Sequence, residues 1–493
     1  MMFSTPTGRW PRPLAALAVL AALAGACKKD DGPVTPPTTP PTTPPTTPAA
    51  SSQVAVWLTT PDRSALFYRQ KVSLQFAANT NSYPTIAVDT TQTYQTMDGF
   101  GYTLTGGSAQ VMSRMSSSAR AALIKELFAT DSTSLGVSYL RVSIGASDLN
   151  DQVYTYDDAP APDPTLTQFS LAPDQAYFIP VLKEILAVNP SIKILGSPWT
   201  APAWMKTNNA YVGGSLDPAY YPAYAQYFVK YIQGMQAAGI TIDAVTLQNE
   251  PLNPYNNPSM VMTGAQQAEF IKSHVGPAFR AAGISTKIIA YDHNPDTEGQ
   301  QFVNTVLSDA AASAYIDGSA WHLYAGSIDV LSSIRNTYPS KNIYFTEQYT
   351  KAPGNFAADL PWHVQNLEIG AARNWARNVL EWNLASDQAY GPHTPGGCTE
   401  CLGALTLASG DQVTRNVAYY TVAHASKFVP AGSVRLGSTA EGVLPNVAFR
   451  TPQGRHVLLV QNDRATAQAF GIRSGAQVAS ATLPAGAVAT YVW

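Results

Sequence analysis

Cysteine and charge are both scarce in this chain. Three cysteines stand among 493 residues, at Cys27, Cys398 and Cys401, and the two neighbouring thiols cannot by themselves supply the four ligands of structural zinc. Only 13% of the residues are charged, and a net charge of −3 with a pI of about 6.2 lacks the basic balance of nucleic-acid-binding proteins. We therefore expect no nucleic-acid partner, and no cluster of residues calls for a metal or a cofactor.

A long hydrophobic run is also missing. The apolar stretch Leu14–Leu23 near the N-terminus is too short to span a bilayer comfortably. It follows Arg9 and Arg12 and leads through small residues to Cys27. In this it resembles a bacterial lipoprotein signal, in which the cysteine becomes the lipidated first residue. Plain secretion with cleavage near Ala26 is the alternative.

A tract rich in proline and threonine follows over residues 34–48. Proline fixes φ and removes a donor, so the tract should be an extended spacer without a core. We expect residues 1–27 to be the signal and 28–52 the linker. The protein would then be an outer-membrane or cell-surface lipoprotein, or otherwise secreted or periplasmic. We expect a monomer that touches the membrane only through its anchor.

Strand-like and helix-like segments alternate from residue 91 onward. Apolar runs predict strands over 97–105, 139–144, 192–197, 242–249, 287–291, 319–323, 342–346 and 378–384. Helices are predicted over 116–128, 174–186, 218–238, 264–282, 297–312, 328–336, 359–374 and 413–428. Eight such pairs favour a (β/α)8 TIM barrel. A doubly wound open sheet is the alternative, although no Gly-x-Gly-x-x-Gly fingerprint follows the first strand.

The segments before and after the predicted barrel show a different pattern of apolar residues. Residues 54–58 and 72–76 are strand-like near the N-terminus, and 457–460 and 488–493 are strand-like near the C-terminus. We expect residues 53–90 and 431–493 to form a side β-sandwich, packed on a catalytic barrel over 91–430.

Two glutamates end predicted strands. Glu250 follows the fourth strand, where Pro251 forbids its continuation, and Glu347 ends the seventh. Chemistry in TIM barrels sits at these strand ends, and glycoside hydrolysis needs a pair of carboxylates. Either glutamate alone could as well be a salt-bridge or cap residue, so it is the pairing that favours a catalytic function.

Other polar and aromatic residues follow the same strand ends. They are Asp98, Arg141, Asp148, Trp199, Trp204, Lys206, Asn249, Asp292, His293, Asn294, His322, Tyr324, Trp382 and Asn383. Each has a purely structural interpretation. Arg141 could bridge barrel strands, and Asp148 could cap a turn. His322 could be a core histidine with satisfied hydrogen bonds, and Trp199 could fill the core.

Several stretches together resemble glycoside hydrolase family 30, which includes glucosylceramidases and microbial β-1,6-glucanases. They are Asp98-Gly99-Phe100-Gly101, Tyr139-Leu140-Arg141-Val142, Gly196 to Lys206, Leu247 to Pro251, His322-Leu323-Tyr324, Phe345-Thr346-Glu347 and Glu381 to Ala385. They occur in the family's order, and the resemblance covers residues 54–493. It implies a (β/α)8 barrel with a side β-sandwich.

The resemblance also implies roles for individual residues. Glu250 matches the acid/base and Glu347 the nucleophile, and Asn249 matches the residue that contacts the sugar 2-hydroxyl. The subsite for the terminal sugar matches Arg141, Asp148, Trp199, His322, Tyr324 and Trp382. We expect Glu250 to need a raised pKa, because it must be protonated when it acts.

The Cys398-Thr399-Glu400-Cys401 stretch lies in a loop after the eighth strand. A thioredoxin-type site would need a helix start within a βαβ unit, and the preceding Gly396 and Gly397 argue against it. In an exported protein we expect a disulfide that pins the loop beside the cleft.

The substrate is expected to be a β-linked glucan. Gly99 to Ala109 and Gly391 to Cys401 resemble the bacterial β-1,6-glucanase branch, so hydrolysis of β-1,6-glucan with retention is the leading interpretation. An exo-acting β-glucosidase, a glucosylceramidase or a β-xylosidase is the alternative within the family. A glycan-binding surface lipoprotein without turnover is the alternative of another class.

Overall fold

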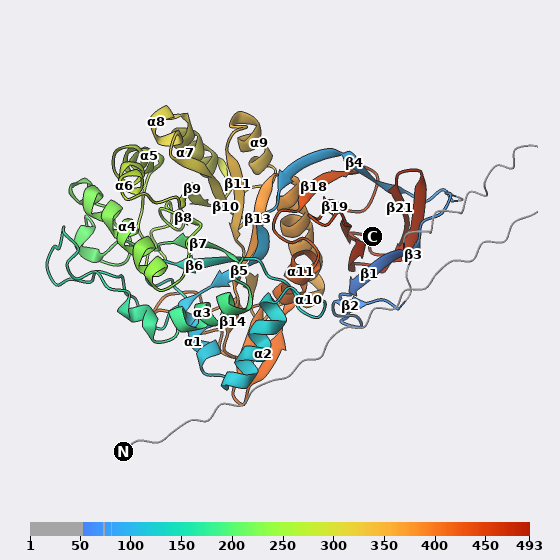
Figure 1. Ribbon diagram of the computed structural model, residues 1–493, viewed down its shortest axis with the longest axis horizontal. Coiled ribbons are helices and arrows are strands. Elements are labelled where there is room, and N and C mark those ends of the chain that lie inside the picture. The colour runs from blue at the N-terminus through green and yellow to red at the C-terminus, as the bar shows by residue number, and fades with distance from the viewer. Residues whose placement is uncertain (1–52, 72–73, 80) are drawn as a thin grey trace, which may run out of the picture. The chain divides into compact units, whose positions relative to one another are not determined.

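A closed eight-stranded parallel barrel forms the centre of the computed structural model, which describes residues 53–71, 74–79 and 81–493 (Figure 1). In order around the barrel, its strands are β5 (Gly99–Leu104), β6 (Tyr139–Ser143), β7 (Lys193–Ser197), β8 (Ala244–Thr246), β9 (Lys287–His293), β10 (Ile316–His322), β11 (Asn342–Glu347) and β13 (Ala376–Asn383). The predicted TIM barrel is therefore confirmed. The predicted signal, 1–27, and the whole predicted linker, 28–52, lie outside the described residues.

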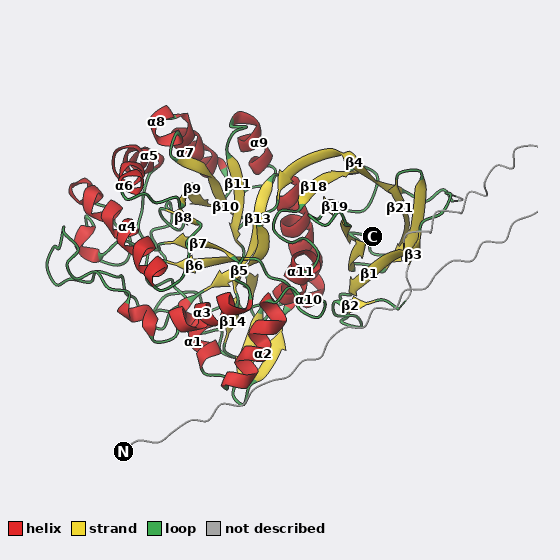
Figure 2. Cartoon of the chain, in the orientation of Figure 1, coloured by secondary structure: helices red, strands yellow, loops and turns green. Residues whose placement is uncertain are grey.

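Helices cover the outside of the barrel (Figure 2). The α-helices are α1 (Gly106–Ser113), α2 (Ser117–Phe128), α3 (Phe178–Val188), α4 (Tyr221–Ala237), α5 (Gly264–Phe270), α6 (Gly276–Ala281), α7 (Thr297–Ser308), α8 (Ala310–Ser313), α9 (Val330–Thr337), α10 (Phe356–His363) and α11 (Val417–Ser426). Short 3₁₀ segments are η1 (Ala172–Gln175), η2 (Ala203–Met205) and η3 (Pro218–Tyr220), and π-helical ones are η4 (Ile271–Val275) and η5 (Val364–Ala371).

Several predicted elements differ in extent from the observed ones. The fourth strand is short, because Asn249 and Glu250 leave the sheet to reach the barrel mouth. The predicted helix over 264–282 is one helical run in which a π-turn separates α5 from α6. Helix α1 was not predicted, since its glycine-rich start hides the helical pattern; the Thr105 side chain caps it by accepting from the Ser108 N–H.

The side sandwich is a ten-stranded sheet built from both chain ends. Its strands run in the order β2 (Tyr68–Arg69), β1 (Gln53–Thr59), β23 (Val488–Val492), β20 (His456–Gln461), β19 (Asn446–Arg450), β18 (Val434–Ser438), β4 (Thr85–Thr96), β21 (Gln468–Ser474) and β22 (Gln477–Leu483), with β3 (Leu74–Gln75) on β1. The boundary predicted after residue 90 falls within β4. Strand β4 pairs with β18 as far as Thr96, so the sandwich sheet extends to the first residues of the barrel.

Smaller strands lie among the loops at the barrel mouth. Strand β12 (Thr350–Lys351) pairs with β15 (Cys401–Leu402), and β14 (Ala385–Ser386), β16 (Leu405–Ala408) and β17 (Gln412–Arg415) form a three-stranded sheet. The predicted last helix, 413–428, begins with residues that belong to β17. Their pairing with β16 overrides that helical pattern, so α11 begins only at Val417.

Side chains along the sandwich strands point alternately to opposite faces, so they contribute to two hydrophobic cores. In β19, Val447 and Phe449 pack into the core shared with the barrel, whereas Ala448 between them packs into the sandwich's own core. Helix α11 lies between the two parts (Figure 1). On it, His424 is hydrogen-bonded to Thr59 of β1 at 2.8 Å and to Thr490 of β23 at 2.9 Å. The sandwich is thus fixed to the barrel by apolar packing and by a buried histidine.

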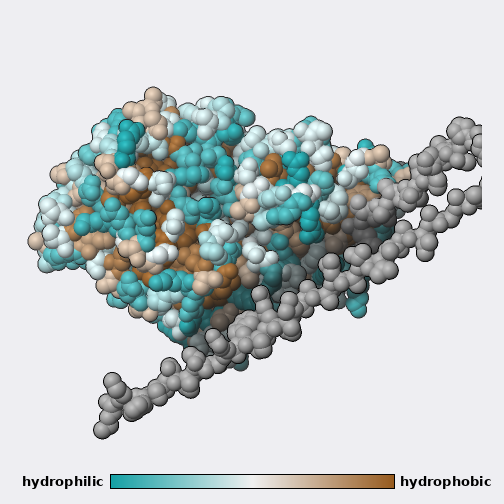
Figure 3. Space-filling model, viewed as in Figure 1, coloured by the Kyte–Doolittle hydropathy of each residue, from teal (hydrophilic) through white to brown (hydrophobic). Residues whose placement is uncertain are grey.

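Within the described residues, no helix is both long and apolar enough to cross a membrane. On the face shown in Figure 3, apolar residues gather over the barrel, but polar ones are interspersed among them.

A buried carboxylate pair lies between barrel strand β13 and helix α11. Glu381 of β13 is hydrogen-bonded to His363 at 2.7 Å, and Glu368 of the η5 π-turn is fully buried nearby. Neither carboxylate oxygen of Glu368 has a hydrogen-bond partner among the described residues. Burial and the charge of Glu381 raise the pKa of Glu368 well above its ordinary value.

We expect Glu368→Gln to stabilise the protein increasingly as pH rises. Glu368 is protonated in the fold but ionised in the unfolded chain above its ordinary pKa, so folding takes up a proton and stability falls with rising pH. The neutral amide removes this dependence. Thermal unfolding from about pH 5 to about pH 8 should show the variant's advantage growing with pH. Glu441→Gln, at an exposed position, is the control, and an advantage that stays constant with pH would contradict the assignment.

Candidate active site

Glu250 and Glu347 face one another at the mouth of the barrel. Glu347 ends β11, and Glu250 follows β8 in a backbone conformation with φ of +45°. The Glu250 N–H donates to the Asp292 carbonyl at 2.9 Å, which ties this strained residue to the neighbouring strand. One oxygen of each glutamate and one nitrogen of His322 all lie within 4.8 Å of one another. The two carboxylates are thus as close as a retaining glycosidase requires, about 5–5.5 Å.

A cavity of about 310 Å³ lies directly against both glutamates. Its lining is aromatic, acidic and amide, and consists of Asp148, Trp199, Glu250, Asn253, Asn256, His293, Asn294, Tyr324, Glu347, Tyr349, Trp382 and Cys401. Flat aromatic faces and hydrogen-bonding side chains in one concave site suit a sugar ring.

Strand periodicity explains why the barrel interior changes from apolar to polar toward the carboxyl ends of the strands. The apolar layer contains Tyr139, Leu195, Ala244, Ile289, Ala320, Tyr344 and Leu380, one from each strand β6 to β13. Inward positions recur every two residues, so the next layer holds Arg141, Ser197, Thr246, His322, Thr346 and Trp382. Polar side chains therefore meet at the carboxyl ends of the strands.

Strand β9 departs from this period by one residue. Tyr291 and Asp292 both have positive φ, and the pairing with β10 shifts there, so Asp292 rather than Tyr291 enters the polar layer. Its carboxylate accepts hydrogen bonds from Ser197, Thr246 and Thr346 at 2.6–2.8 Å. Although burial opposes it, the charge of Arg141, the hydrogen bond and charge of His322 and the Thr346 hydrogen bond lower the pKa of Asp292 far below its usual range.

Arg141 joins the buried carboxylates. It is fully buried, and its guanidinium donates to Glu347 at 2.5 Å, Asp292 at 2.8 Å and Asn249 at 2.6 Å. The guanidinium also lies 4.9 Å from the Trp199 ring centroid. Arg141 thus bridges charged groups, and through them it fixes the glutamate predicted to be the nucleophile.

His322 lies among three carboxylates. Its Nε2 is 3.1 Å from Asp292, and its Nδ1 is 3.3 Å from Glu250 and 3.6 Å from Glu347. Burial opposes its charge, but the surrounding carboxylates, Glu347 foremost, raise the pKa of His322 to about 9. The imidazole is therefore protonated at neutral pH.

The expectation of a raised pKa at Glu250 is wrong for this unliganded site. Burial raises that pKa, but the hydrogen bond and charge of His322, the charge of His293 and a 2.8 Å bond from Asn253 bring the pKa of Glu250 to about 2. The proton that the acid needs lies on His322, 3.3 Å from Glu250.

Glu347 receives two strong donors. Besides Arg141, the Tyr324 hydroxyl donates to it at 2.9 Å. Burial and the charges of Glu250 and Asp292 raise the pKa of Glu347, whereas His322 and Arg141 oppose the rise. Two direct donors and an adjacent imidazolium are the groups that stabilise the ionised form.

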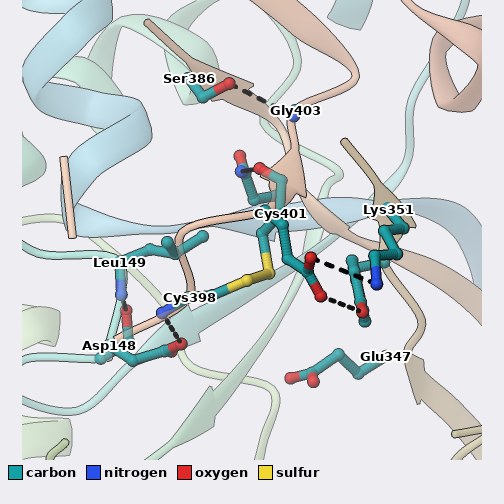
Figure 4. The surroundings of a disulfide bond; sticks show 12 residues. Asp148, Leu149, Glu347, Lys351, Ser386, Cys398, Cys401 and Gly403 are labelled. Carbon is teal, nitrogen blue, oxygen red and sulfur yellow. Dashed lines mark hydrogen bonds and ion pairs between the residues drawn. A yellow bond between two sulfur atoms is a disulfide. The ribbon is translucent and has the colours of Figure 1, made fainter. Parts of the chain in front are cut away.

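Asp148, Trp199 and Trp382 line the same cavity as Glu347. Trp199 and Trp382 stack with centroids 5.4 Å apart. Burial and the charge of Glu347 raise the pKa of Asp148 to about 7, and the Cys398 N–H donates to its carboxylate at 3.3 Å. Figure 4 shows this contact beside the Cys398–Cys401 disulfide, with Glu347 facing the same space. The disulfide loop therefore positions Asp148.

Some residues noted at strand ends lie elsewhere. Asp98 is at the opposite end of the barrel, where it pairs with Arg377 at 2.7 Å, because it precedes β5 rather than ending it. Trp204 donates its indole N–H to the Asp157 carbonyl, and Lys206 donates to the Ser259 carbonyl at 2.8 Å. Neither of these two lines the catalytic cavity.

The site also contains residues that the resemblance did not supply. Asp292, His293 and Asn294 follow the fifth strand, and their place at a strand end was the available signal. Asn253, Asn256 and Tyr349 come from loops, where no periodicity marks an inward side chain. Asn253 contacts Glu250 directly.

Glu250, His322 and Glu347 have donor atoms close enough to share a metal ion. Their charge does not favour one, because His322 is protonated and Arg141 already neutralises part of the Glu347 charge. The arrangement fits proton transfer between ionisable groups better than cation binding.

Comparison with known proteins agrees with this geometry. Residues 97–429 match the glycosyl hydrolase family 30 TIM-barrel domain, and 432–491 match the family's beta sandwich domain. Endo-1,6-beta-D-glucanase BGN16.3 of Trichoderma harzianum is 38% identical over 402 residues, 76% of this chain and 79% of that protein. Putative glucosylceramidase 2 of Caenorhabditis elegans is 28% identical over 439 residues, 84% of this chain and 83% of that protein.

A solved structure extends the similarity to the whole fold. The endo-beta1,6-glucanase BT3312 superposes with a TM-score of 0.83 at 35% identity, covering 90% of this chain and 99% of that one. With both domains matched and the two carboxylates at the barrel mouth, this chain belongs to glycosyl hydrolase family 30.

Proposed function

We propose that the protein is an endo-acting β-1,6-glucanase that retains the anomeric configuration. The close approach of Glu250 and Glu347 across the cavity is the observation that carries the retaining mechanism. The substrate proposal is supported by the relatives that are endo-1,6-beta-glucanases, one of them similar in sequence and one in structure.

Glu347 is the nucleophile in this proposal. Its carboxylate attacks the anomeric carbon and forms a covalent glycosyl-enzyme bond as the glycosidic C–O bond breaks. Arg141 and Tyr324 hold the two oxygens in place, so the attacking geometry exists before the sugar binds. Asn249, held by Arg141, is the residue for the sugar 2-hydroxyl.

Glu250 is the acid and later the base. The proton moves from His322 Nδ1 to Glu250, and from Glu250 to the departing oxygen. Once Glu347 is esterified its negative charge is gone, so a main contributor to the raised pKa of His322 is lost and proton release is favoured. In the second half, Glu250 takes a proton from the water that attacks the anomeric carbon, and Glu347 departs as a carboxylate. With that negative charge restored, the proton returns from Glu250 to His322, which closes the cycle.

Asp148, Trp199 and Trp382 hold the terminal sugar. The carboxylate of Asp148 can accept from two hydroxyls, and the two stacked indoles offer flat faces to sugar C–H groups. Trp199 is almost fully buried, so it serves the site mainly by shaping the wall and supporting Trp382.

The two glutamates are expected to respond differently to amide substitution. Glu347→Gln should abolish measurable turnover, because no covalent bond can form. Glu250→Gln should lower kcat about 10²- to 10⁴-fold on natural linkages, and much less on a glycoside whose leaving group needs no proton. Both are measured by steady-state kinetics, and a 2-fluoro glycoside should label Glu347 in the wild type.

Glu368→Gln serves as the matched control for these variants, since Glu368 is buried but remote from the cavity. It should keep wild-type turnover. Covalent label at Glu368 or Glu381 would refute the assignment of the nucleophile, as would full activity of Glu347→Gln.

The substrate is tested by comparing β-1,6-glucan with laminarin, xylan and glucosylceramide. We expect gluco-oligosaccharides from β-1,6-glucan and slower or no release from the others, because relatives similar in sequence are named endo-1,6-beta-D-glucanases. Glucose alone as the first product would favour an exo-acting glucosidase, and preference for the lipid would favour a glucosylceramidase. Binding without cleavage would favour a glycan-binding lipoprotein.

We further propose that Cys27 is lipidated and that the chain is displayed on a membrane surface. The basic, apolar and small-residue order before Cys27 and the proline-rich spacer after it support this. In a Gram-negative host producing the full chain, we expect the wild type in the membrane fraction and Cys27→Ser in the soluble fraction. Equal fractionation of both would contradict lipidation.

A further inference from the structure

Tyr255 is the most exposed of the large hydrophobic residues, with 86% of its surface accessible. The others, such as Tyr68 at 52% and Trp362 at 41%, retain more contact with the fold. A single exposed aromatic is ordinary on a protein surface and carries no function by itself. What distinguishes Tyr255 is where its backbone is held.

The backbone of Tyr255 is tied to the proposed acid/base. The Tyr255 N–H donates to the Asn253 Oδ1 at 3.0 Å, and the amide of Asn253 donates to Glu250 at 2.8 Å. The neighbours Asn253 and Asn256 both line the catalytic cavity, whereas Tyr255 between them does not. The backbone of Tyr255 is therefore held beside residues that line the cavity, and its ring extends into solvent.

Two flanking loops hold the segment 253–259 in place. The side chain of Asn257 donates to the Pro395 carbonyl at 2.7 Å, and the Asn257 carbonyl accepts from Thr394. On the other side, the Ser259 N–H donates to the Tyr211 carbonyl at 3.0 Å. An exposed ring on such a cross-tied loop is a pre-organised platform, so a ligand would order little on binding it.

We infer that Tyr255 is a platform for a glucose unit on the leaving-group side of the scissile bond. Asp148, Trp199 and Trp382 enclose the sugar that Glu347 attacks, while Glu250 delivers its proton to the departing sugar. Tyr255 stands beside Glu250, and its flat ring suits the C–H face of a glucopyranose. The amides of Asn253 and Asn256 are placed to meet that sugar's hydroxyls. This inference rests on the proposed function and names a residue that favours polymer over short glycosides.

The test compares substrates with and without a sugar on the leaving-group side. Tyr255→Ala should lower kcat/KM roughly 3- to 10-fold on β-1,6-linked gluco-oligosaccharides, mainly through KM, because stacking on the ring is lost. On β-glucosyl fluoride, whose leaving group is an ion rather than a sugar, the variant should match wild type. Tyr255→Trp should restore oligosaccharide kinetics, and Tyr68→Ala, at another exposed tyrosine, should change neither substrate.

Two results would contradict the proposed role of Tyr255 as a sugar-binding platform. Equal losses on the fluoride and the oligosaccharides would mean that Tyr255 only supports the loop, and no loss on either would mean that the ring is unused. A wild type that turns over glucosyl fluoride but no β-1,6-linked oligosaccharide would instead refute the proposed substrate. The failure of the platform and the failure of the proposed function are therefore distinguishable.

Discussion

The buried guanidinium of Arg141 is the interaction on which the active site depends. It lies among Glu347, Asp292 and Asn249 in a barrel interior where an unpaired charge would be very costly. Removing one partner of such a buried pair typically destabilises a protein by about 3–5 kcal/mol, because the other charge is left uncompensated. The network therefore holds the nucleophile in position and forces its neighbours to carry defined charges.

Those charges explain why His322 rather than Glu250 carries the proton before substrate binds. Three carboxylates surround the imidazole, and only one of them, Glu250, receives no contact from Arg141. The proton on His322 can move toward Glu250 only when the negative charge around the imidazole decreases. Bond formation at Glu347 decreases it. In the proposed mechanism, the charge change at Glu347 and the proton delivery to the leaving group are thus coupled through one side chain, His322.

Periodicity made much of this site readable from the sequence. Arg141, His322 and Trp382 lie two residues beyond apolar inward positions, so the barrel prediction placed them at its mouth. Asp292 could not be placed in this way, because positive φ at Tyr291 and Asp292 shifts the strand by one residue. The domain boundary was harder to predict from the sequence. Strand β4 continues through Thr96, and its pairing with β18 and β21 shows that it belongs to the sandwich. Which of the two glutamates has the lower pKa depends on distances between side chains, and the spacing of residues along the sequence does not determine those distances.

The structure separates the chemistry from the choice of substrate. Arg141, Asp292, His322 and Glu347 come from barrel strands, whose packing allows them little freedom. Asp148, Asn253, Tyr255 and Tyr349 come from loops, and those loops are tied mainly to one another, by Asn257 and Thr394 and by the Cys398 contact with Asp148. A change in one loop therefore reaches the others without disturbing the charge network below. Substrate contacts carried by loops can thus vary on a barrel that keeps its charge network, as is common for functional loops on a rigid scaffold.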